Sequence, residues 1–387
     1  MRRIGILTHY YNSKNIGGLL QAYALTKVLS QHDFFAEQIS FVFQTYDVKA
    51  YPIRKKLYPK VFKWKDVFLY PVRLLKCLLI KWYLHPYLMV QNGVINGFAN
   101  TIPHSIRVYN NLNINYCNDS YDVICIGSDQ VWNLDLLPHF AYYGEFAKPE
   151  KKVIAYAASS NTKQFSPIAE QIFIDKLQRI NAISVREKTL KKYIEHITNR
   201  NVTVVLDPTF LISHQEWLKI AHPVSVPQKP YIFCYFLGSK AAWQREMAQI
   251  YADKYGYEII HLPYITQYVR KSDKYLKGIT HYDVGPREFI SLINGAECVF
   301  TDSFHGLAFS INFGKNFYVF NRDDENGVNS MNARITDTLE MFSLTKRHIK
   351  NKDVIFNNRP IDFTNAHKIL EQEKQKSIDW LLNALKE

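Results

Sequence analysis

The stretch TDSFHG, residues 301–306, places an aspartate, a serine and a histidine where an apolar run ends. AECVF precedes it and should be a buried strand, and LAFSINF follows it and should be a helix. Histidine can give up or take a proton near neutral pH, because its ordinary pKa is about 6.5. Asp302 and His305 are therefore candidates for proton transfer, although a strand-end aspartate usually caps a helix and a lone histidine usually packs.

Two further polar stretches follow apolar runs in the first half of the chain. GSDQVWN (127–133) follows YDVICI, and VRE (185–187) closes AISVRE. Each stretch alone is weak evidence. If the apolar runs are parallel strands, however, their carboxyl ends meet at one edge of a sheet, and these side chains converge on one crevice.

The elements that would position these residues alternate between strand and helix. RIGILTH (3–9), LLQAYALTKVL (19–29) and EQISFVF (37–43) predict a βαβ opening and hence a parallel sheet. HPVSVPQKP, within 221–230, carries three prolines and predicts a linker. Further strands are expected at 121–128, 151–159, 182–187, 202–210, 231–238, 257–263, 298–302 and 316–322, and helices at 166–180, 241–256, 285–296 and 306–314.

The fold class is therefore α/β, with two Rossmann-like, doubly wound domains facing an interdomain cleft. We expect an N-terminal domain at 1–222, a C-terminal domain at 223–345 and a helical tail at 346–387. A basic, aromatic insertion at about 44–116 interrupts the first domain. Its four prolines at 51–89 predict several short helices. The insertion either packs on the main body or presents its Lys, Arg, Trp and Phe side chains to lipid headgroups.

The charge and the composition limit the kinds of partner that this protein can have. Lys and Arg number 48 against 35 Asp and Glu, so the net charge of +13 indicates an anionic partner. Nucleic acid is not expected, because no helix-turn-helix, zinc or RNA-recognition signature is present. Five scattered cysteines without a CxxC pair indicate reduced thiols. We recognise no signal peptide and no membrane-spanning run. The expected location is cytoplasmic, with peripheral attachment to the inner face of the cell membrane as an option.

Seven blocks resemble, in the same order, the polysaccharide pyruvyl transferase family. They are NIGGLLQAYAL (15–25), VICIGSDQVWN (123–133), KKVIAYAAS (151–159), SVREKT (184–189), VVLDPTFL (204–211), YIFCYFLG (231–238) and GPREFISLINGAECVFTDSFHGLAFSI (285–311). The resemblance implies a glycosyltransferase-B-like fold and transfer of pyruvate from phosphoenolpyruvate to sugar hydroxyls as a ketal. The implied acceptor is a polyprenyl-diphosphate-linked saccharide of surface polysaccharide (exopolysaccharide) biosynthesis, and no cofactor is expected besides phosphoenolpyruvate as co-substrate.

For this chemistry an acid must protonate the C3 methylene of phosphoenolpyruvate so that a hydroxyl can attack C2. The resemblance assigns His305 to that role, and Asp302 would keep it protonated against the helix dipole. Arg186 matches the family arginine that binds the donor's anionic groups, although a salt bridge with Glu187 or another acid is also open. The other donor-binding candidates are Arg334, Arg322, Ser303 and Gly306, and surface pairing of the two arginines is open as well.

One departure from the family lies in the histidine block. Part of the family has an Asp-Arg-Leu-His-Gly pattern there, whereas this chain has Ser303 and Phe304 in place of the arginine and the leucine. One donor-binding guanidinium is therefore missing, and the donor need not be phosphoenolpyruvate.

The candidate acceptor-binding residues all fall in the first domain: Asn15, Gly17, Gly18, Asp129, Gln130 and Trp132. The first three stand at the first strand–helix turn, where small residues let a ligand approach the backbone or simply shape the turn. The carboxylate and the amide could bind hydroxyls, and the tryptophan is either a stacking face for a sugar or a core residue. No metal-ligand spacing is recognised, so no metal is expected.

Two other functions stay open. A glycosyltransferase that uses a nucleotide sugar could share this scaffold, because fold does not decide function. A non-catalytic saccharide-binding protein could also retain it. Donor preference would separate the first from a pyruvyl transferase, and turnover of any saccharide acceptor would exclude the second.

Overall fold

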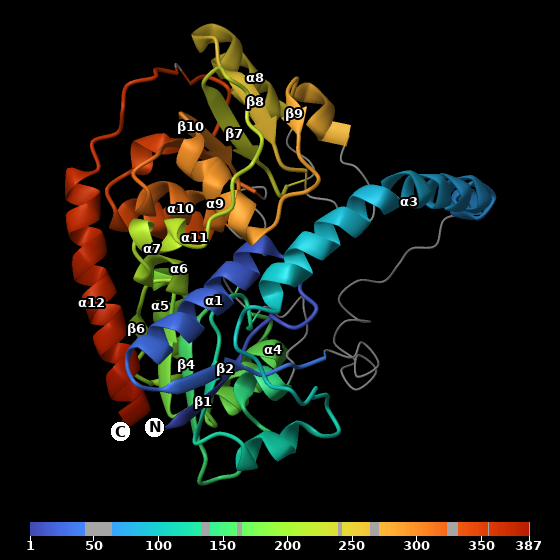
Figure 1. Cartoon of the computed structure of the whole chain (residues 1–387). Coiled ribbons are helices and arrows are strands. Elements are labelled where there is room, and N and C mark those ends of the chain that lie inside the picture. The colour runs from blue at the N-terminus through green and yellow to red at the C-terminus, as the bar shows by residue number, and fades with distance from the viewer. Residues whose placement is uncertain are drawn as a thin grey trace.

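The protein is described here by a computed structural model of the whole chain, which covers residues 1–42, 64–132, 140–160, 165–238, 242–263, 271–322, 332–354 and 356–386. Within these residues the chain forms two six-stranded sheets, which lie one above the other in Figure 1 with helices packed around them. The first sheet has the order β2-β1-β3-β4-β5-β6. Its strands are β1 (Arg3–Leu7), β2 (Phe35–Gln38), β3 (Val123–Ile126), β4 (Lys152–Ala158), β5 (Ala182–Val185) and β6 (Thr203–Val204).

The second sheet has the order β12-β11-β10-β7-β8-β9. Each pair of neighbouring strands in both sheets is parallel within the described ranges. The strand order reverses between β1 and β3 in the first sheet and between β7 and β10 in the second, so the expected doubly wound α/β fold is confirmed. The strands of the second sheet are β7 (Tyr231–Tyr235), β8 (Glu258–His261), β9 (Ile279–Thr280), β10 (Cys298–Thr301), β11 (Asn316–Phe320) and β12 (His348–Ile349).

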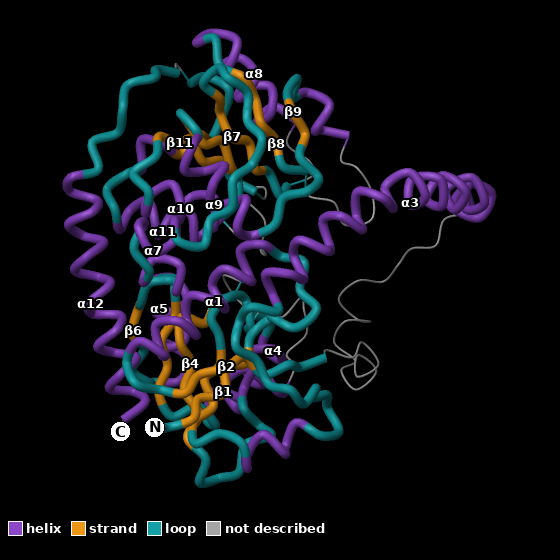
Figure 2. The backbone as a smooth tube through the Cα atoms, viewed as in Figure 1, coloured by secondary structure: helices purple, strands orange, loops and turns teal. Residues whose placement is uncertain are grey.

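Helices connect the strands and fill the space between the two sheets, as the tube in Figure 2 shows. The 221–230 segment, expected as a linker, contains no helix or strand. The α-helices are α1 (Ile16–Gln31), α3 (Trp64–Ala99), α4 (Pro167–Leu177), α5 (Lys188–Thr198), α6 (Pro208–Leu211), α7 (His214–Leu218), α8 (Ala242–Tyr255), α9 (Pro286–Gly295), α10 (Phe304–Asn312), α11 (Ala333–Met341) and α12 (Thr364–Lys386). The 3₁₀ turns are η2 (Ile114–Asp119), η4 (Phe140–Tyr143), η5 (Lys271–Tyr275) and η6 (Thr345–Arg347).

One apolar core continues from the first domain into the second. Helix α1 contacts α6 of its own domain and α9 of the other. Trp217 of α7 packs on Phe309 of α10, with ring centroids 5.0 Å apart, and both side chains are buried. Burial of an aromatic side chain contributes about 2–3 kcal/mol, so these contacts hold the domains together at the level of the candidate site.

The tail returns to the first domain. After β12, which extends the second sheet beyond residue 345, α12 packs against α10 of the second domain and against α6 and β4 of the first. The Leu206 amide donates a hydrogen bond to Ser377 Oγ of α12 at 2.9 Å. Arg2 donates to the last carbonyls of α12, including that of Leu385. The chain therefore crosses between the domains twice.

The insertion differs from the expected series of short helices. Residues 64–99 form one continuous helix, α3, which passes through Pro71 and Pro86. Each interior proline removes one backbone hydrogen bond, but the surrounding Leu, Lys and Met residues are good helix formers. The helix is also anchored at its carboxyl-terminal end, where Ile95 and Phe98 are buried. Pro52 and Pro59 lie outside the described residues.

All ten predicted strands are shorter in the structure, and the changes in two of them have a clear cause. β2 ends at Gln38, because the chain then leaves β1 and Phe41 instead forms a bridge with Tyr109. β6 covers Thr203–Val204 alone, because Asp207 caps the short helix α6. The second change places a carboxylate at the edge where the polar strand ends gather.

Candidate functional site

His305 lies where the first turns of two helices from different domains meet. It belongs to α10, whose N-cap Ser303 accepts a hydrogen bond from the Gly306 amide at 3.4 Å. The ring faces Gly17 of α1 so closely that a Cβ added there would lie 2.0 Å from His305 Nδ1. His305 is only 6% exposed, and its Nε2 has no hydrogen-bond partner among the described residues. An unpartnered buried nitrogen at a domain boundary is suited to receive a ligand atom.

The charges around His305 differ from the predicted arrangement. Burial lowers its pKa most, Asp207 and Asp129 raise it, and Arg186 lowers it again. Asp302 was expected as the charge partner, but its carboxylate accepts the backbone amides of Leu237 at 2.5 Å and Gly238 at 2.8 Å. That part of the prediction is corrected, because Asp302 ties the ends of β7 and β10 together at the switch point of the second sheet.

Arg186 is held by buried carboxylates. Its Nη1 donates to Asp207 Oδ2 at 2.6 Å and its Nη2 to Asp129 Oδ1 at 3.2 Å, while Glu187 Oε1 lies 3.9 Å from its Nε. These acids raise the pKa of Arg186, although burial opposes them. The guanidinium and its neighbours in turn lower the pKa of Asp129 to about 2. Of the two roles that the sequence left open, the ion pair is present, and anion binding stays a prediction.

Three arginines gather near the start of α10. The guanidinium carbons of Arg186 and Arg334 lie 4.9 Å and 5.8 Å from the centre of the Phe304 ring. Burial, Arg186 and Arg322 together lower the pKa of Arg334 to about 10. Mutual repulsion of this kind is relieved when an anion binds. Phe304, which stands where part of the family has leucine, thus contacts both guanidinium groups.

One cap, one glycine and one hydrogen bond between a strand end and a helix start give the site its shape. Asn15 Oδ1 accepts the Gly18 amide at 3.2 Å and begins α1, and a Cβ at Gly18 would meet Asn15 at an ordinary 3.4 Å. A Cβ at Gly306 would lie 2.5 Å from Thr301 Oγ1, so α10 approaches its strand closely only because residue 306 is glycine. The Arg322 amide donates to Asn332 Oδ1 at 2.9 Å, which joins the end of β11 to the start of α11.

Trp132 is a core residue, which corrects the stacking role proposed for it. It is 1% exposed, its Nε1 donates to the Tyr142 carbonyl at 3.0 Å, and its ring stacks on Tyr143. No face of the indole is left for a sugar. Its neighbour Gln130 is half-buried, and the Nε2 of that side chain has no hydrogen-bond partner within the described ranges.

Sequence reasoning missed Asp207 and His9, and it named Glu187 only as a possible ion-pair partner of Arg186. Asp207 stands in the Asp-Pro pair that begins α6, where its Oδ1 accepts the Thr209 amide at 3.0 Å, so only its capping role could be read from the sequence. His9 follows β1, and its Nε2 lies 3.3 Å from the Gln130 carbonyl oxygen. Glu187 accepts a 2.6 Å hydrogen bond from Ser159 Oγ, and burial raises its pKa to about 7.

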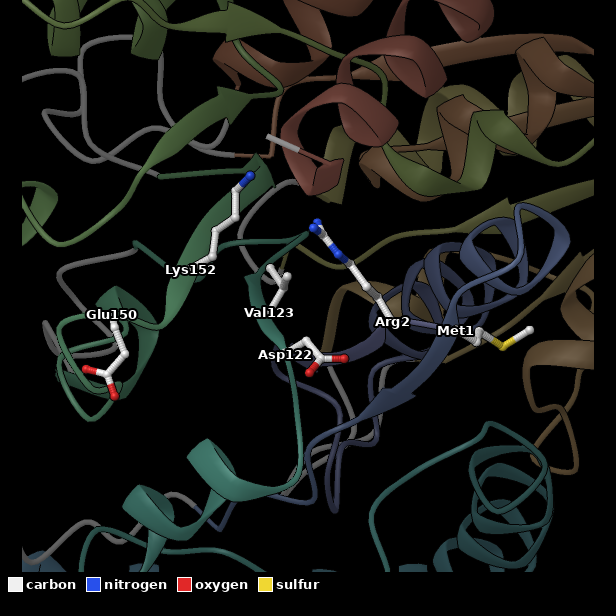
Figure 3. Close-up of a pocket in the computed structure, with 6 residues that line it drawn as sticks. All are labelled: Met1, Arg2, Asp122, Val123, Glu150 and Lys152. Carbon is white, nitrogen blue, oxygen red and sulfur yellow. The ribbon is translucent and has the colours of Figure 1, made fainter.

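A separate hollow of about 430 Å³ lies at the opposite edge of the first sheet. Figure 3 shows it at the amino-terminal ends of β1, β3 and β4, lined by Met1, Arg2, Asp122, Val123, Glu150 and Lys152. Ligands of doubly wound sheets bind at the carboxyl ends of the strands. The residues around His305 are therefore the stronger candidate.

Within the described ranges, no three His, Cys, Asp or Glu side chains gather as a metal site, and no helix is long and apolar enough to cross a membrane. The expected absence of a metal stays a prediction. Four of the five cysteines lie buried as free thiols, and the side chain of Cys77 is outside the described residues.

Comparisons with known proteins agree with the blocks found in the sequence. The sequence model of the family described as polysaccharide pyruvyl transferase matches residues 15–324. No curated protein sequence matches significantly.

Solved structures with a similar course of the chain include three bacterial and archaeal enzymes. UDP-GlcNAc 2-epimerase from Neisseria meningitidis has 11% identity and a TM-score of 0.47, covering 97% of this chain and 100% of its own. The corresponding enzyme from Methanocaldococcus jannaschii has 14% identity and a TM-score of 0.47, with 96% and 92% covered. MurG from Acinetobacter baumannii has 10% identity and a TM-score of 0.45, with 99% and 100% covered.

Proposed function

Because the chain belongs to the polysaccharide pyruvyl transferase family, we propose that it transfers the pyruvyl group of phosphoenolpyruvate to two hydroxyls of a saccharide and forms a cyclic ketal. The observation that carries this proposal is the buried, unpartnered Nε2 of His305 beside a cluster of arginines. A proton donor next to positive charge is what an enol phosphate needs, since its C3 must be protonated while its phosphate and carboxylate are neutralised.

The surrounding charges make the protonation state of His305 depend on whether the donor is bound. Burial and the neighbouring arginines hold its pKa below the ordinary value when the site is empty. Phosphoenolpyruvate brings phosphate and carboxylate charges, which favour the imidazolium when they lie beside it. Donor binding therefore converts His305 from a neutral base into the acid that protonates C3. Ser303 adds no charge to this site, and Arg334 and Arg322 are the cations that stand in for the missing guanidinium.

The acceptor in this proposal is a saccharide on a polyprenyl diphosphate at an anionic membrane surface. The supporting feature is α3, whose amino-terminal part extends away from both sheets in Figure 1. Trp82 is 79% exposed and Tyr83 61% exposed on this helix. Exposed aromatic side chains on a protein of charge +13 suit the interface between headgroups and acyl chains.

Phosphate release from phosphoenolpyruvate tests the reaction. The protein is incubated with phosphoenolpyruvate and either a lipid-linked saccharide extract or a panel of p-nitrophenyl hexopyranosides. We expect acceptor-dependent release that His305→Ala abolishes and that His32→Ala, a control at the far end of α1, leaves unchanged. A melting temperature that rises with UDP-sugars and not with phosphoenolpyruvate would instead support a nucleotide-sugar glycosyltransferase. Binding without turnover of any acceptor would support a saccharide-binding protein.

Vesicle binding tests the location of the acceptor. We expect the protein to sediment with vesicles of phosphatidylcholine and phosphatidylglycerol and not with phosphatidylcholine alone. Trp82→Ser should weaken that binding, whereas Ile168→Ser, which changes another exposed apolar residue (68% exposed) on α4, should not. Equal binding to both vesicle types, or none, would remove the membrane surface from the proposal.

A further inference from the structure

We propose that His9 is the general base that accepts the proton of the saccharide hydroxyl as this hydroxyl attacks the donor, an inference that rests on the proposed function. The acid of the reaction comes from the second domain. The geometry at the end of β1 supplies a second imidazole from the first domain, on the side of the site where the acceptor candidates lie.

The position of His9 is fixed by its neighbours. The ring packs edge-on against Tyr142 of η4, with centroids 4.6 Å apart. Its Nε2 lies 3.3 Å from the carbonyl oxygen of Gln130. Thr8 Oγ1 donates to the Ser128 carbonyl at 2.7 Å and so joins the end of β1 to the loop after β3. The imidazole is thus held at the switch point of the first sheet, where ligands of such sheets bind.

The same contacts decide which nitrogen can act as a base. A carbonyl oxygen only accepts hydrogen bonds, so Nε2 of His9 carries the proton in its contact with Gln130. The neutral ring then has its lone pair on Nδ1. This nitrogen makes no hydrogen bond with any residue that the structure describes. A fixed tautomer with a free acceptor nitrogen is the arrangement that a general base requires.

One carboxylate, that of Asp129, interacts electrostatically with both histidines. Asp129 raises the pKa of both His9 and His305, while burial lowers the pKa of each. Arg186 holds this carboxylate at 3.2 Å. Among the residues that the structure describes, Asp129 and Gln130 from the loop after β3 and Tyr142 from η4 act on the His9 ring. Because burial is the largest influence, the pKa of His9 lies below its ordinary value, which favours the neutral ring that can accept a proton.

The step balances without a further reactant. The oxygen of the first hydroxyl forms a bond to C2 and its proton passes to Nδ1 of His9, while the C2–C3 π electrons take a proton from His305. The bond between C2 and the phosphate oxygen then breaks, and the leaving phosphate takes the proton from His9. The second hydroxyl attacks C2 and its proton returns to His305. Phosphoenolpyruvate and a diol thus become a ketal and hydrogen phosphate, with both histidines restored.

A tautomer measurement tests the geometry before any turnover is needed. Long-range ¹H–¹⁵N spectra of protein labelled with ¹⁵N-histidine would be recorded at pH 7, and His9→Gln would identify the His9 signals. We expect a neutral ring with its proton on Nε2. A proton on Nδ1, or a doubly protonated ring, would overturn the inference.

Kinetics test the role. With phosphoenolpyruvate and a p-nitrophenyl hexopyranoside, His9→Ala should lower kcat by about 10²–10⁴-fold with little change in KM for phosphoenolpyruvate. In the plot of kcat against pH, the part that rises with pH should disappear. Added imidazole should restore part of kcat. Neither result is expected if His9 only packs. His32→Ala should keep the wild-type profile.

The two proposals fail differently. If the wild type is active and His9→Ala retains its kcat and its rising limb, the base assignment is wrong and the proposed function stands. If the wild type releases no phosphate with any acceptor, the proposed function fails, and the tautomer measurement still decides whether His9 has the geometry of a base.

Discussion

Replacing Gly17 by alanine should disable the site without unfolding the protein. The added Cβ would lie 2.0 Å from Nδ1, 2.4 Å from Cγ and 2.7 Å from Cε1 of His305. Ordinary carbon contacts lie at about 3.5–4.0 Å, so the imidazole must withdraw by roughly 1.5–2 Å. The backbone of Gly17 is not left-handed, so alanine fits its conformation, and the conflict is confined to the contact between α1 and α10.

The expected loss follows from this displacement. A general acid must lie within hydrogen-bond reach of the atom that it protonates, and a misplacement of about 1 Å costs on the order of 10²-fold in rate. Gly17→Ala should therefore lower kcat by about 10²-fold or more. Alanine is about 1 kcal/mol more favourable than glycine inside a helix, which should offset part of any loss of domain contact in a thermal melt.

Gly18→Ala is the matched control. The Cβ that it adds meets Asn15 at an ordinary 3.4 Å and does not reach His305. It adds the same methyl group one residue further along α1. We expect near wild-type kcat, because this methyl group meets Asn15, and a slightly raised melting temperature; an effect on acceptor binding would appear in the KM for the acceptor and not in kcat. Phosphate release from phosphoenolpyruvate with saturating acceptor is the assay for both variants.

A double variant makes the test specific. Once His305 is alanine there is no ring to displace, so Gly17→Ala should cause no further loss in a His305→Ala protein. Equal kcat for Gly17→Ala and the wild type would refute the reasoning, since the ring would then not be held against α1 during catalysis. A further loss in the double variant would show that Gly17 acts elsewhere.

Three other results are expected. Arg186→Ala leaves two buried carboxylates without their partner and should lower the free energy of unfolding, measured by urea denaturation, by about 3–5 kcal/mol. Lys148→Ala breaks an exposed ion pair and should lower it by less than about 1 kcal/mol. The pKa of Glu187 is about 7 when folded against an ordinary 4.5. The stability that its raised pKa contributes is therefore present below pH 4.5 and lost as pH rises through 7. Glutamine does not titrate, so the free energy of unfolding of Glu187→Gln should rise by about 3 kcal/mol relative to that of the wild type between these pH values. No such rise would contradict that pKa. Burial lowers the pKa of His305 in the free enzyme, which kcat/KM reports, and bound donor raises it in the complex, which kcat reports. With rising pH, kcat/KM should therefore fall at a lower pH than kcat does. If both fell at the same pH, the pKa of His305 would not depend on the donor.

The sequence predicted the elements that depend on local patterns. Alternating apolar runs and helical stretches led to two doubly wound sheets, and parallel strands bring their carboxyl ends together whatever their order. From the sequence alone, Arg186 and Asp129 could therefore be assigned to the carboxyl edge of the first sheet, and His305 to that of the second. Helix α3 was predicted wrongly, because Pro71 and Pro86 were given more weight than the helix formers around them.

Contacts between distant residues could not be predicted in the same way. Nothing near Asp207 signals its ion pair with Arg186, and nothing near Gly17 signals that His305 rests on it, because each contact joins separate strands or separate domains. Trp132 shows the same limit, since both a sugar platform and a core residue follow a strand end. When a side chain has two possible partners, packing decides which of them it contacts, and spacing in the sequence does not describe packing.

The double crossing of the chain has a mechanical consequence. The 221–230 segment leads into the second domain, and the stretch before α12 leads back to the first. Two rigid bodies that are joined at two places rotate most easily about the line through both connections, and the connections oppose sliding and twisting. A separation of the two domains would lift His305 away from Gly17, and their return would restore that contact. The position of the His305 imidazole against Gly17 therefore depends on how the chain joins the two domains.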